Sequence, residues 1–100
     1  MAEQLPIPMP MDKIRAFCRK HHIRKMWVYG SVLTPRFAND SDVDILVDFE
    51  EGKAPGWAFA TLHEELEPLW GRKVDLSTPA DFRPSRREQV LSQARIIYGH

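Results

Sequence analysis

The most regular pattern in the 100-residue chain is a stretch of alternating apolar and acidic positions over residues 42–49. The apolar set comprises Val43, Ile45, Val47 and Phe49, and the acidic set comprises Asp42, Asp44 and Asp48. A period of two is typical of a β-strand whose two faces meet different surroundings. The pattern predicts a strand that turns its apolar face to a core and its acidic face outward.

Shorter stretches with an apolar or helical pattern predict the remaining elements. The predicted strands cover residues 26–29 and 73–77, the predicted helices cover about 12–21, 59–69 and 86–95, and an apolar tail follows at 96–98. Asp12 is a candidate cap of the first helix, whose inward residues include Cys18. Gly71 is a candidate terminator of the second helix, but Pro68 predicts that this helix ends early or kinks.

Two further features concern the leader and the large aromatic residues. Three prolines within residues 1–11 predict an extended or frayed leader. Trp57 and Trp70 are each compatible with a core or an interface; Trp57 follows Pro55 and Gly56 and is the better candidate for a partner contact, although core packing is favoured. Tyr29 is equally compatible with stacking on a base and with filling the face of the sheet.

The candidate chemistry lies in two places, a turn and a set of carboxylates. Gly30 ends a predicted strand, where the absence of a Cβ lets a phosphate approach the backbone, and Ser31 offers a hydroxyl and an amide. At about 3.3 Å of rise per residue, Asp42 and Asp44 lie roughly 6.6 Å apart on one face, so both can contact one or two hard cations. Taken alone, the Gly-Ser pair is an ordinary turn and helix cap; ten residues before D-x-D, it indicates a phosphate site.

Asp75 lies between two apolar residues of the second predicted strand, an unusual position for a charge. A neighbouring strand would bring it beside Asp42 and Asp44, and three such carboxylates repel one another unless a divalent metal neutralises them. Oxygen-only ligands favour magnesium. Asp48 lies too far along its strand to share those ions, and we expect it to mark the solvated end of the strand.

The chain resembles the minimal nucleotidyltransferases of the DNA polymerase β superfamily. The resemblance rests on Tyr29-Gly30-Ser31, on residues 41–49, on Arg72-Lys73-Val74-Asp75-Leu76 and on the G-S-x10-D-x-D spacing, and it extends from about Ile14 to the end. It implies an α+β (α/β) fold in which helices flank a small mixed sheet. It also implies that Asp42, Asp44 and Asp75 bind two Mg²⁺ ions, that Ser31 contacts the nucleotide triphosphate, and that Asp75 accepts the proton of the nucleophile.

The sequence departs from the family between the turn and the acidic pair. Relatives often carry a small basic segment ending in Arg-Gly, whereas here the segment Val32-Leu33-Thr34-Pro35 follows Ser31. Arg36 is the nearest cation along the chain. Either Arg36 contacts the phosphates together with Gly30 and Ser31, or the site binds triphosphate more weakly.

Length and composition narrow the range of functions. One hundred residues form a single domain with a radius of gyration of about 13 Å, which leaves little protein to select an acceptor, so we expect a partner to present it. Fourteen basic and fourteen acidic residues give a formal net charge of zero without a basic stripe, which disfavours extended nucleic-acid binding. The basic stretch 83–87 is expected to start a solvated helix.

The single cysteine and the four histidines exclude other classes of site. Cys18 has no disulfide partner and is expected in the core, and the histidines lack the spacing of a zinc site. Gly52-Lys53 lacks the rest of a P-loop. With neither a signal peptide nor an apolar run long enough to span a membrane, we expect a cytoplasmic protein.

Two functions of different classes remain. In the first, which the family resemblance implies, the protein transfers AMP from ATP to a hydroxyl, a tyrosine of a HEPN-type toxin, and is the antitoxin of that toxin. In the second, it neutralises the same partner by occlusion without catalysis. Transfer to a small molecule is a third possibility, disfavoured by the lack of an acceptor domain. A homodimer through a sheet edge is compatible with the sequence.

Overall fold

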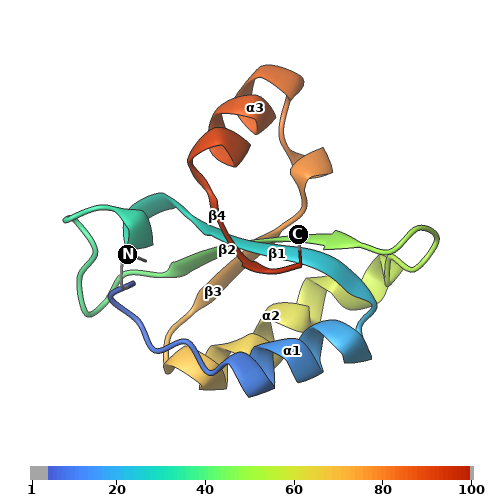
Figure 1. The fold of residues 1–100 in the computed structure, drawn as a ribbon, viewed down its shortest axis with the longest axis horizontal. Helices are drawn as coiled ribbons and strands as arrows, with labels where there is room; N and C mark the ends of the chain where they lie inside the picture. The colour runs from blue at the N-terminus through green and yellow to red at the C-terminus, as the bar shows by residue number, and fades with distance from the viewer. Residues whose placement is uncertain (1–4, 100) are drawn as a thin grey trace.

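The computed structural model describes residues 5–99 as a four-stranded sheet with helices on both faces (Figure 1). The helices are α1 (Met11–Lys20), α2 (Phe59–Trp70) and α3 (Pro84–Gln93), the strands are β1 (Ile23–Tyr29), β2 (Val43–Phe49), β3 (Val74–Ser77) and β4 (Arg95–Tyr98), and three 3-10 turns are η1 (Gly30–Leu33), η2 (Gly56–Ala58) and η3 (Pro79–Asp81). Helices α1 and α2 lie side by side on one face, and α3 lies on the other. The radius of gyration is 13.1 Å, as expected for one domain of this length.

The sheet is mixed, as the resemblance implied. Its strand order is β3-β2-β1-β4, in which β2 pairs antiparallel with β1 and parallel with β3. Strand β4 pairs antiparallel with β1, so residues 96–98 form an edge strand and not a tail. Four residues carry too little pattern to reveal a strand, because it is the pairing with β1, some seventy positions earlier, that stabilises it. Strand β1 also begins at Ile23, three residues before the prediction.

The main core lies between the sheet and the α1 and α2 helices. Its fully buried side chains include Ile14 of α1, Leu66 of α2 and the β2 residues Val43, Ile45 and Val47. Cys18 is buried here as predicted, and burial raises the pKa of its thiol to about 12, so it stays protonated. The predicted apolar face of residues 42–49 is therefore the face that α1 and α2 cover.

A second, smaller core lies on the opposite face of the sheet. It consists of Trp27 of β1, Leu46 of β2 and Val90 of α3. Leu46 lies between Asp44 and Asp48 on this face of β2 and is fully buried. The expectation that this face points outward is therefore wrong for the middle of the strand. At the far end of the face, Asp48 is half-buried and forms an ion pair with Arg24.

The leader lies against the main core, and α1 begins without the predicted cap. Residues 1–4 lie outside the described part of the chain, but Ile7 is only 5% exposed and the Pro8 carbonyl accepts a hydrogen bond of 2.7 Å from Trp70 Nε1. These residues are therefore docked on the main core and not frayed, although they form no helix or strand. Asp12 is not the cap of α1: the cap position is Pro10, and the carboxylate of Asp12 pairs with Arg15.

Helix α2 follows an exposed segment and runs to its glycine terminator. Pro68 lies in its last turn without ending it, and Gly71 takes the left-handed conformation, φ 64°, that closes the helix as predicted. Trp70 is buried, but Trp57 is 98% exposed, so the core-packing interpretation of Trp57 is wrong. Phe59, and not Trp57, packs edge-to-face on Phe49, with ring centroids 6.1 Å apart.

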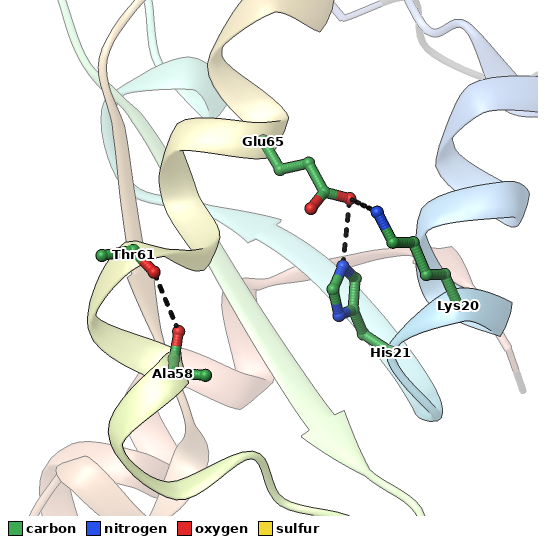
Figure 2. Close-up of polar contacts among 5 residues, drawn as sticks. All are labelled: Lys20, His21, Ala58, Thr61 and Glu65. Atoms are coloured by element: carbon green, nitrogen blue, oxygen red, sulfur yellow. Dashed lines mark hydrogen bonds and ion pairs between the residues drawn. The ribbon is translucent and has the colours of Figure 1, made fainter.

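Polar contacts join α1 and α2 at the surface (Figure 2). Glu65 of α2 accepts a hydrogen bond of 3.2 Å from Lys20 Nζ, and its Oε2 lies 3.0 Å from His21 Nε2. Near the start of the same helix, the Thr61 hydroxyl donates to the Ala58 carbonyl at 3.3 Å. In residues 5–99 no helix combines the length and the apolar composition needed to cross a membrane.

Candidate active site

Parallel pairing of β2 and β3 brings the predicted carboxylates to one end of the sheet. Asp44 and Asp75 are direct partners in the parallel register, and the Val43 N–H donates to the Lys73 carbonyl at 2.9 Å. Partners in register project from the same face of a sheet, so the two aspartates lie on the face that carries α3. Asp42 lies just before β2; it and Asp75 are exposed, and Asp44 is half-buried.

The pKa of Asp44 reflects its burial and the two neighbouring carboxylates. Burial first, and then the charges of Asp75 and Asp42, together raise this pKa to about 6, against a backbone hydrogen bond from Ser31 that lowers it. Among the described ion pairs, none involves Asp42, Asp44 or Asp75, so no Lys or Arg of residues 5–99 offsets their charge by a direct pair. The three groups form a concentration of negative charge that suits a cation.

Gly30 is placed against Asp44 by the pairing of β1 with β2. Tyr29 is the register partner of Asp44, so the residue after it lies beside the carboxylate. Gly30 has φ 77°, and a Cβ at this position would clash with Asp44 Oδ2 and lie 3.2 Å from its Cγ. Both the backbone conformation and the available space therefore require glycine. The Ser31 amide hydrogen bonds to Asp44, whereas the sequence had suggested a phosphate partner for it.

Arg72 fixes the loop that leads into the acidic pair, a role that the sequence did not reveal. Its Nη1 donates to the carbonyls of Ala38, Asn39 and Ser41 at 2.8, 3.1 and 3.0 Å. Its guanidinium also lies 4.4 Å from the centroid of the Phe37 ring. Three carbonyls on one nitrogen and a stacked ring hold residues 37–41 in place, and Asp42 follows directly. The arginine immediately before the Lys-Val-Asp motif was the only available signal in the sequence.

Tyr29 lies at the centre of the site. Burial raises the pKa of Tyr29; a hydrogen bond with Ser77 lowers it, the charges of Asp44 and Asp75 raise it, and the charge of Arg86 lowers it. Its ring also meets Phe82 edge-to-face, with centroids 6.1 Å apart. Tyr29 thus packs on the α3 side of the sheet face, which confirms one of its two interpretations, and its hydroxyl lies in the field of both aspartates.

The structure places the predicted site residues in two groups. Asp42, Asp44, Asp75, Gly30 and Ser31 lie together at one end of the sheet. Arg36 is exposed in the loop after η1, where its backbone N–H donates to Thr34 Oγ1 at 3.2 Å. Besides Gly30 itself, the hollow beside it is lined by residues that were not predicted as site residues, namely Tyr29, Arg86, Gln89, Val90 and Gln93.

The donor set fits a hard divalent cation. Asp42, Asp44 and Asp75 offer only carboxylate oxygens, the ligands that magnesium prefers. Within residues 5–99, however, no three acidic, histidine or cysteine side chains are arranged so as to hold one ion together. The carboxylates are gathered at one end of the sheet without forming a closed ligand cluster, and their metal-binding role stays a prediction.

Comparison with known proteins identifies the fold and the family. Residues 11–97 match the nucleotidyltransferase domain family. The protein adenylyltransferase MntA of Thermococcus cleftensis is 40% identical over 77 residues, which cover 76% of this chain and 74% of that protein. A solved structure of a candidate minimal nucleotidyltransferase is 37% identical, with a TM-score of 0.69 over 83% of this chain and 84% of that one.

Two more distant structures show the same fold. A toxin-antitoxin structure with AMP-PNP is 22% identical, with a TM-score of 0.66 over 89% of this chain and 73% of that one. The toxin-antitoxin MntA-HepT is 21% identical, with a TM-score of 0.64 over 89% of this chain and 69% of that one. The family match and the closer relatives confirm the resemblance drawn from the glycine, serine and aspartate motifs: this chain belongs to the nucleotidyltransferase domain family, as a minimal nucleotidyltransferase.

Proposed function

We propose that this chain transfers AMP from ATP to a hydroxyl group of a partner toxin of the HEPN type, and that it acts as the antitoxin of that toxin. The observation that carries the proposal is the register of Asp44 with Asp75 beside Gly30, which brings the acidic groups and the glycine turn to one end of the sheet. The name of the relative from Thermococcus cleftensis, protein adenylyltransferase, supports AMP as the transferred group.

Each residue of the site takes a definite part in this reaction. Gly30 lets the phosphates approach the backbone, and the Ser31 hydroxyl binds a phosphate oxygen. The acceptor oxygen forms a bond to the α-phosphorus as the bond to the leaving pyrophosphate breaks, and Asp75 accepts the acceptor's proton. Two Mg²⁺ ions held by Asp42, Asp44 and Asp75 would supply activation of the acceptor and neutralisation of the leaving pyrophosphate.

The acceptor is proposed to come from a partner protein. The hollow beside Gly30 has a volume of about 160 Å³, which leaves little room for an acceptor beside the phosphates. A tyrosine of the toxin would meet the carboxylates at the open end of the sheet, where Asp42 and Asp75 are exposed. The fold shared with the toxin-antitoxin MntA-HepT is in keeping with a HEPN-type partner.

A second candidate function is neutralisation of the toxin by occlusion alone. One observation favours it: the segment after Ser31 carries no cation before Arg36, and its residue Val32 is buried in the main core, only 2% exposed. The side chain at this position is therefore in the core and offers no contact to phosphate. If no other cation serves the site, nucleotide binding would be weak and the protein would act by covering its partner.

Mass spectrometry of the toxin separates the two functions. The toxin is co-expressed with the native chain or with a variant that combines Asp42→Asn and Asp44→Asn, and its intact mass is measured. We expect the addition of AMP to the toxin only with the native chain, at a tyrosine. The substitution conserves side-chain volume and relieves repulsion at Asp44, so the fold should persist, which circular dichroism checks.

The alternative outcome is as definite. An unmodified toxin in both samples, together with a stable complex and neutralised toxicity in both, would overturn the catalytic proposal and establish occlusion. Modification that persists with the double variant would show that these aspartates do not hold the catalytic metal.

A further inference from the structure

We infer that Arg86 of α3 supplies the cationic contact to the nucleotide phosphates beside Gly30 and Ser31, in place of the basic segment that this chain lacks. The inference rests on the proposed function, because it names the residue that holds the substrate of that reaction. It also assigns a binding role to α3, a helix that carries none of the sequence motifs.

The geometry of the hollow beside the turn carries the inference. One wall is formed by Tyr29 and Gly30 at the end of β1, and the opposite wall by one side of α3, with Arg86, Gln89, Val90 and Gln93. Arg86 is the only cationic side chain among these lining residues. A phosphate that approaches the Gly30 backbone therefore enters a space in which Arg86 is the available positive charge.

A second, larger hollow lies along the same helix. Its volume is about 610 Å³, and it is lined by Asp81, Phe82, Arg83, Ser85, Arg86 and Gln89. Arg86 and Gln89 line both hollows, so each hollow adjoins these two side chains.

The surroundings of Tyr29 agree with this position of the guanidinium. The Arg86 charge acts on the Tyr29 hydroxyl and lowers its pKa, opposite in sign to the effect of Asp44 and Asp75. The Arg86 charge and the charges of the two carboxylates therefore act on the same hydroxyl, that of Tyr29.

The other cations near the site have different positions. Arg87 is held by the 3-10 turn η3: its Nε donates to the Pro79 carbonyl at 2.8 Å and its Nη2 to the Phe82 carbonyl at 3.1 Å. Arg83 lines the larger hollow but not the one beside Gly30. Arg36 lies exposed in the loop after η1 and lines neither hollow.

The local structure holds Arg86 in place while leaving its guanidinium available. Arg87 ties α3 to η3, and η3 is closed by the Thr78 N–H, which donates to Asp81 Oδ2 at 2.9 Å. Arg86 itself makes a long contact of 3.5 Å to Gln89 Oε1, at the limit of a hydrogen bond, and is exposed. A planar guanidinium of this kind suits bidentate contact with phosphate oxygens.

The test is the affinity of the Mg²⁺-loaded protein for AMP-PNP and for AMP, measured by titration calorimetry on the native chain and its variants. Arg86→Gln should weaken binding of AMP-PNP by at least about tenfold, the loss of one charge-assisted hydrogen bond, and should change AMP binding far less. Arg19→Gln is the matched control, which removes the same charge from the exposed surface of α1, on the other face of the sheet, and should leave the affinity within about twofold. Arg86→Lys should fall between native and Arg86→Gln.

Each result decides between the proposals. Native binding of AMP-PNP with an unchanged affinity in Arg86→Gln, or a loss confined to an Arg36→Gln variant, overturns the role of Arg86 and leaves the proposed function intact. Equal losses for AMP-PNP and AMP also overturn it, because they indicate a structural effect, which the urea midpoint of the variant would reveal independently. No binding of AMP-PNP by the native chain overturns the proposed transfer of AMP together with this inference.

Discussion

The two faces of the sheet are built from the same strands but have different roles. The face under α1 and α2 carries a continuous apolar core, with Ile14 and Leu66 fully buried. The face under α3 carries only a small apolar cluster, with Trp27 and Leu46 at its centre. Beside that cluster, towards one end, the same face carries the aspartates and the glycine turn.

The difference shows how a domain of 100 residues holds repelling charges without losing its fold. A half-buried carboxylate next to two others costs free energy, which the raised pKa of Asp44, about 6, makes visible. The apolar core on the opposite face offsets this cost and leaves the other face free for polar groups. Residues of the two faces are therefore expected to respond to substitution in opposite ways.

The largest expected effect is on transfer, from Asp44→Asn on the charged face. Transfer of AMP should fall to background because a metal ligand is lost, whereas the unfolding free energy at about pH 7 should be unchanged or slightly higher. The sign follows from the raised pKa: the fold disfavours the ionised carboxylate, so a neutral side chain removes repulsion. Labelled ATP measures transfer and urea unfolding measures stability.

The matched control for Asp44→Asn is Asp48→Asn, at the other end of the same strand and outside the cluster. It breaks the ion pair with Arg24 and should leave transfer at the native level. A marked loss of stability in Asp44→Asn would contradict the separation of roles between the faces.

The largest effect on stability should come from the other face. Leu66→Ala removes a fully buried side chain of α2 and should lower the unfolding free energy by about 2 to 5 kcal/mol. Val90→Ala, in the smaller cluster, removes two side-chain carbons where Leu66→Ala removes three, and should cost about 1 to 2 kcal/mol. Urea midpoints compare the two variants, and an equal or larger loss for Val90→Ala would mean that the α3 face carries as much stability as the α1 and α2 face.

A substitution of Arg72 tests whether stability and catalysis are fully separated between the two faces. Arg72→Lys keeps the charge but loses Nη1, which donates to three carbonyls, and the stacking of the guanidinium on Phe37. We expect a loss of about 1 to 3 kcal/mol in stability and faster amide exchange over residues 38–42. Hydrogen exchange with mass spectrometry measures this; the neighbouring Lys73→Arg variant is the control, and unchanged exchange in Arg72→Lys would show that the loop is held by other contacts.

The smallest effect should come from the surface contacts between α1 and α2 (Figure 2). The hydrogen bond from His21, with that from Lys20, lowers the pKa of Glu65 below its usual value. A lowered pKa means that this stabilisation is present above the unfolded value, 4.5, and is lost as the pH falls through the folded one. Glu65→Gln should therefore cost less than about 1 kcal/mol near pH 7 and still less near pH 3.

Urea unfolding of the Glu65→Gln variant and the native chain at both pH values measures the difference. Glu64→Gln, the exposed neighbour, is the control. A difference that grew towards acid pH would contradict the assigned cause of the shift.

Much of the fold could be predicted because its elements have strong local patterns. The alternation in residues 42–49 located β2, and the terminator Gly71 located the end of α2. The fourth strand, β4, was missed because four residues have no distinctive period and depend on a distant partner for pairing. Trp57 was assigned to the core because size and apolarity favour burial, but the turn at Gly56, with φ 65°, and the packing of Phe59 leave it in solvent.

The candidate site was predictable to the extent that it lies in contiguous motifs. The five motif residues, Gly30, Ser31, Asp42, Asp44 and Asp75, were identified by type and spacing, and the structure brings them together. Their catalytic and metal-binding roles stay predictions. The positions of Arg72 and Arg86 were not predictable, because an arginine shows no preference for a loop or a hollow until the chain around it is folded.

The sequence by itself determined the strand periods, the glycine requirement and the family, because these depend on neighbouring residues and on a fixed spacing along the chain. The tertiary structure decided which carboxylates meet, since Asp44 and Asp75 become partners only through the parallel register of β2 and β3. It also decided that α3 covers the charged face and brings Arg86 to the hollow beside Gly30. Register and helix placement follow from packing over the whole chain, which no local pattern encodes.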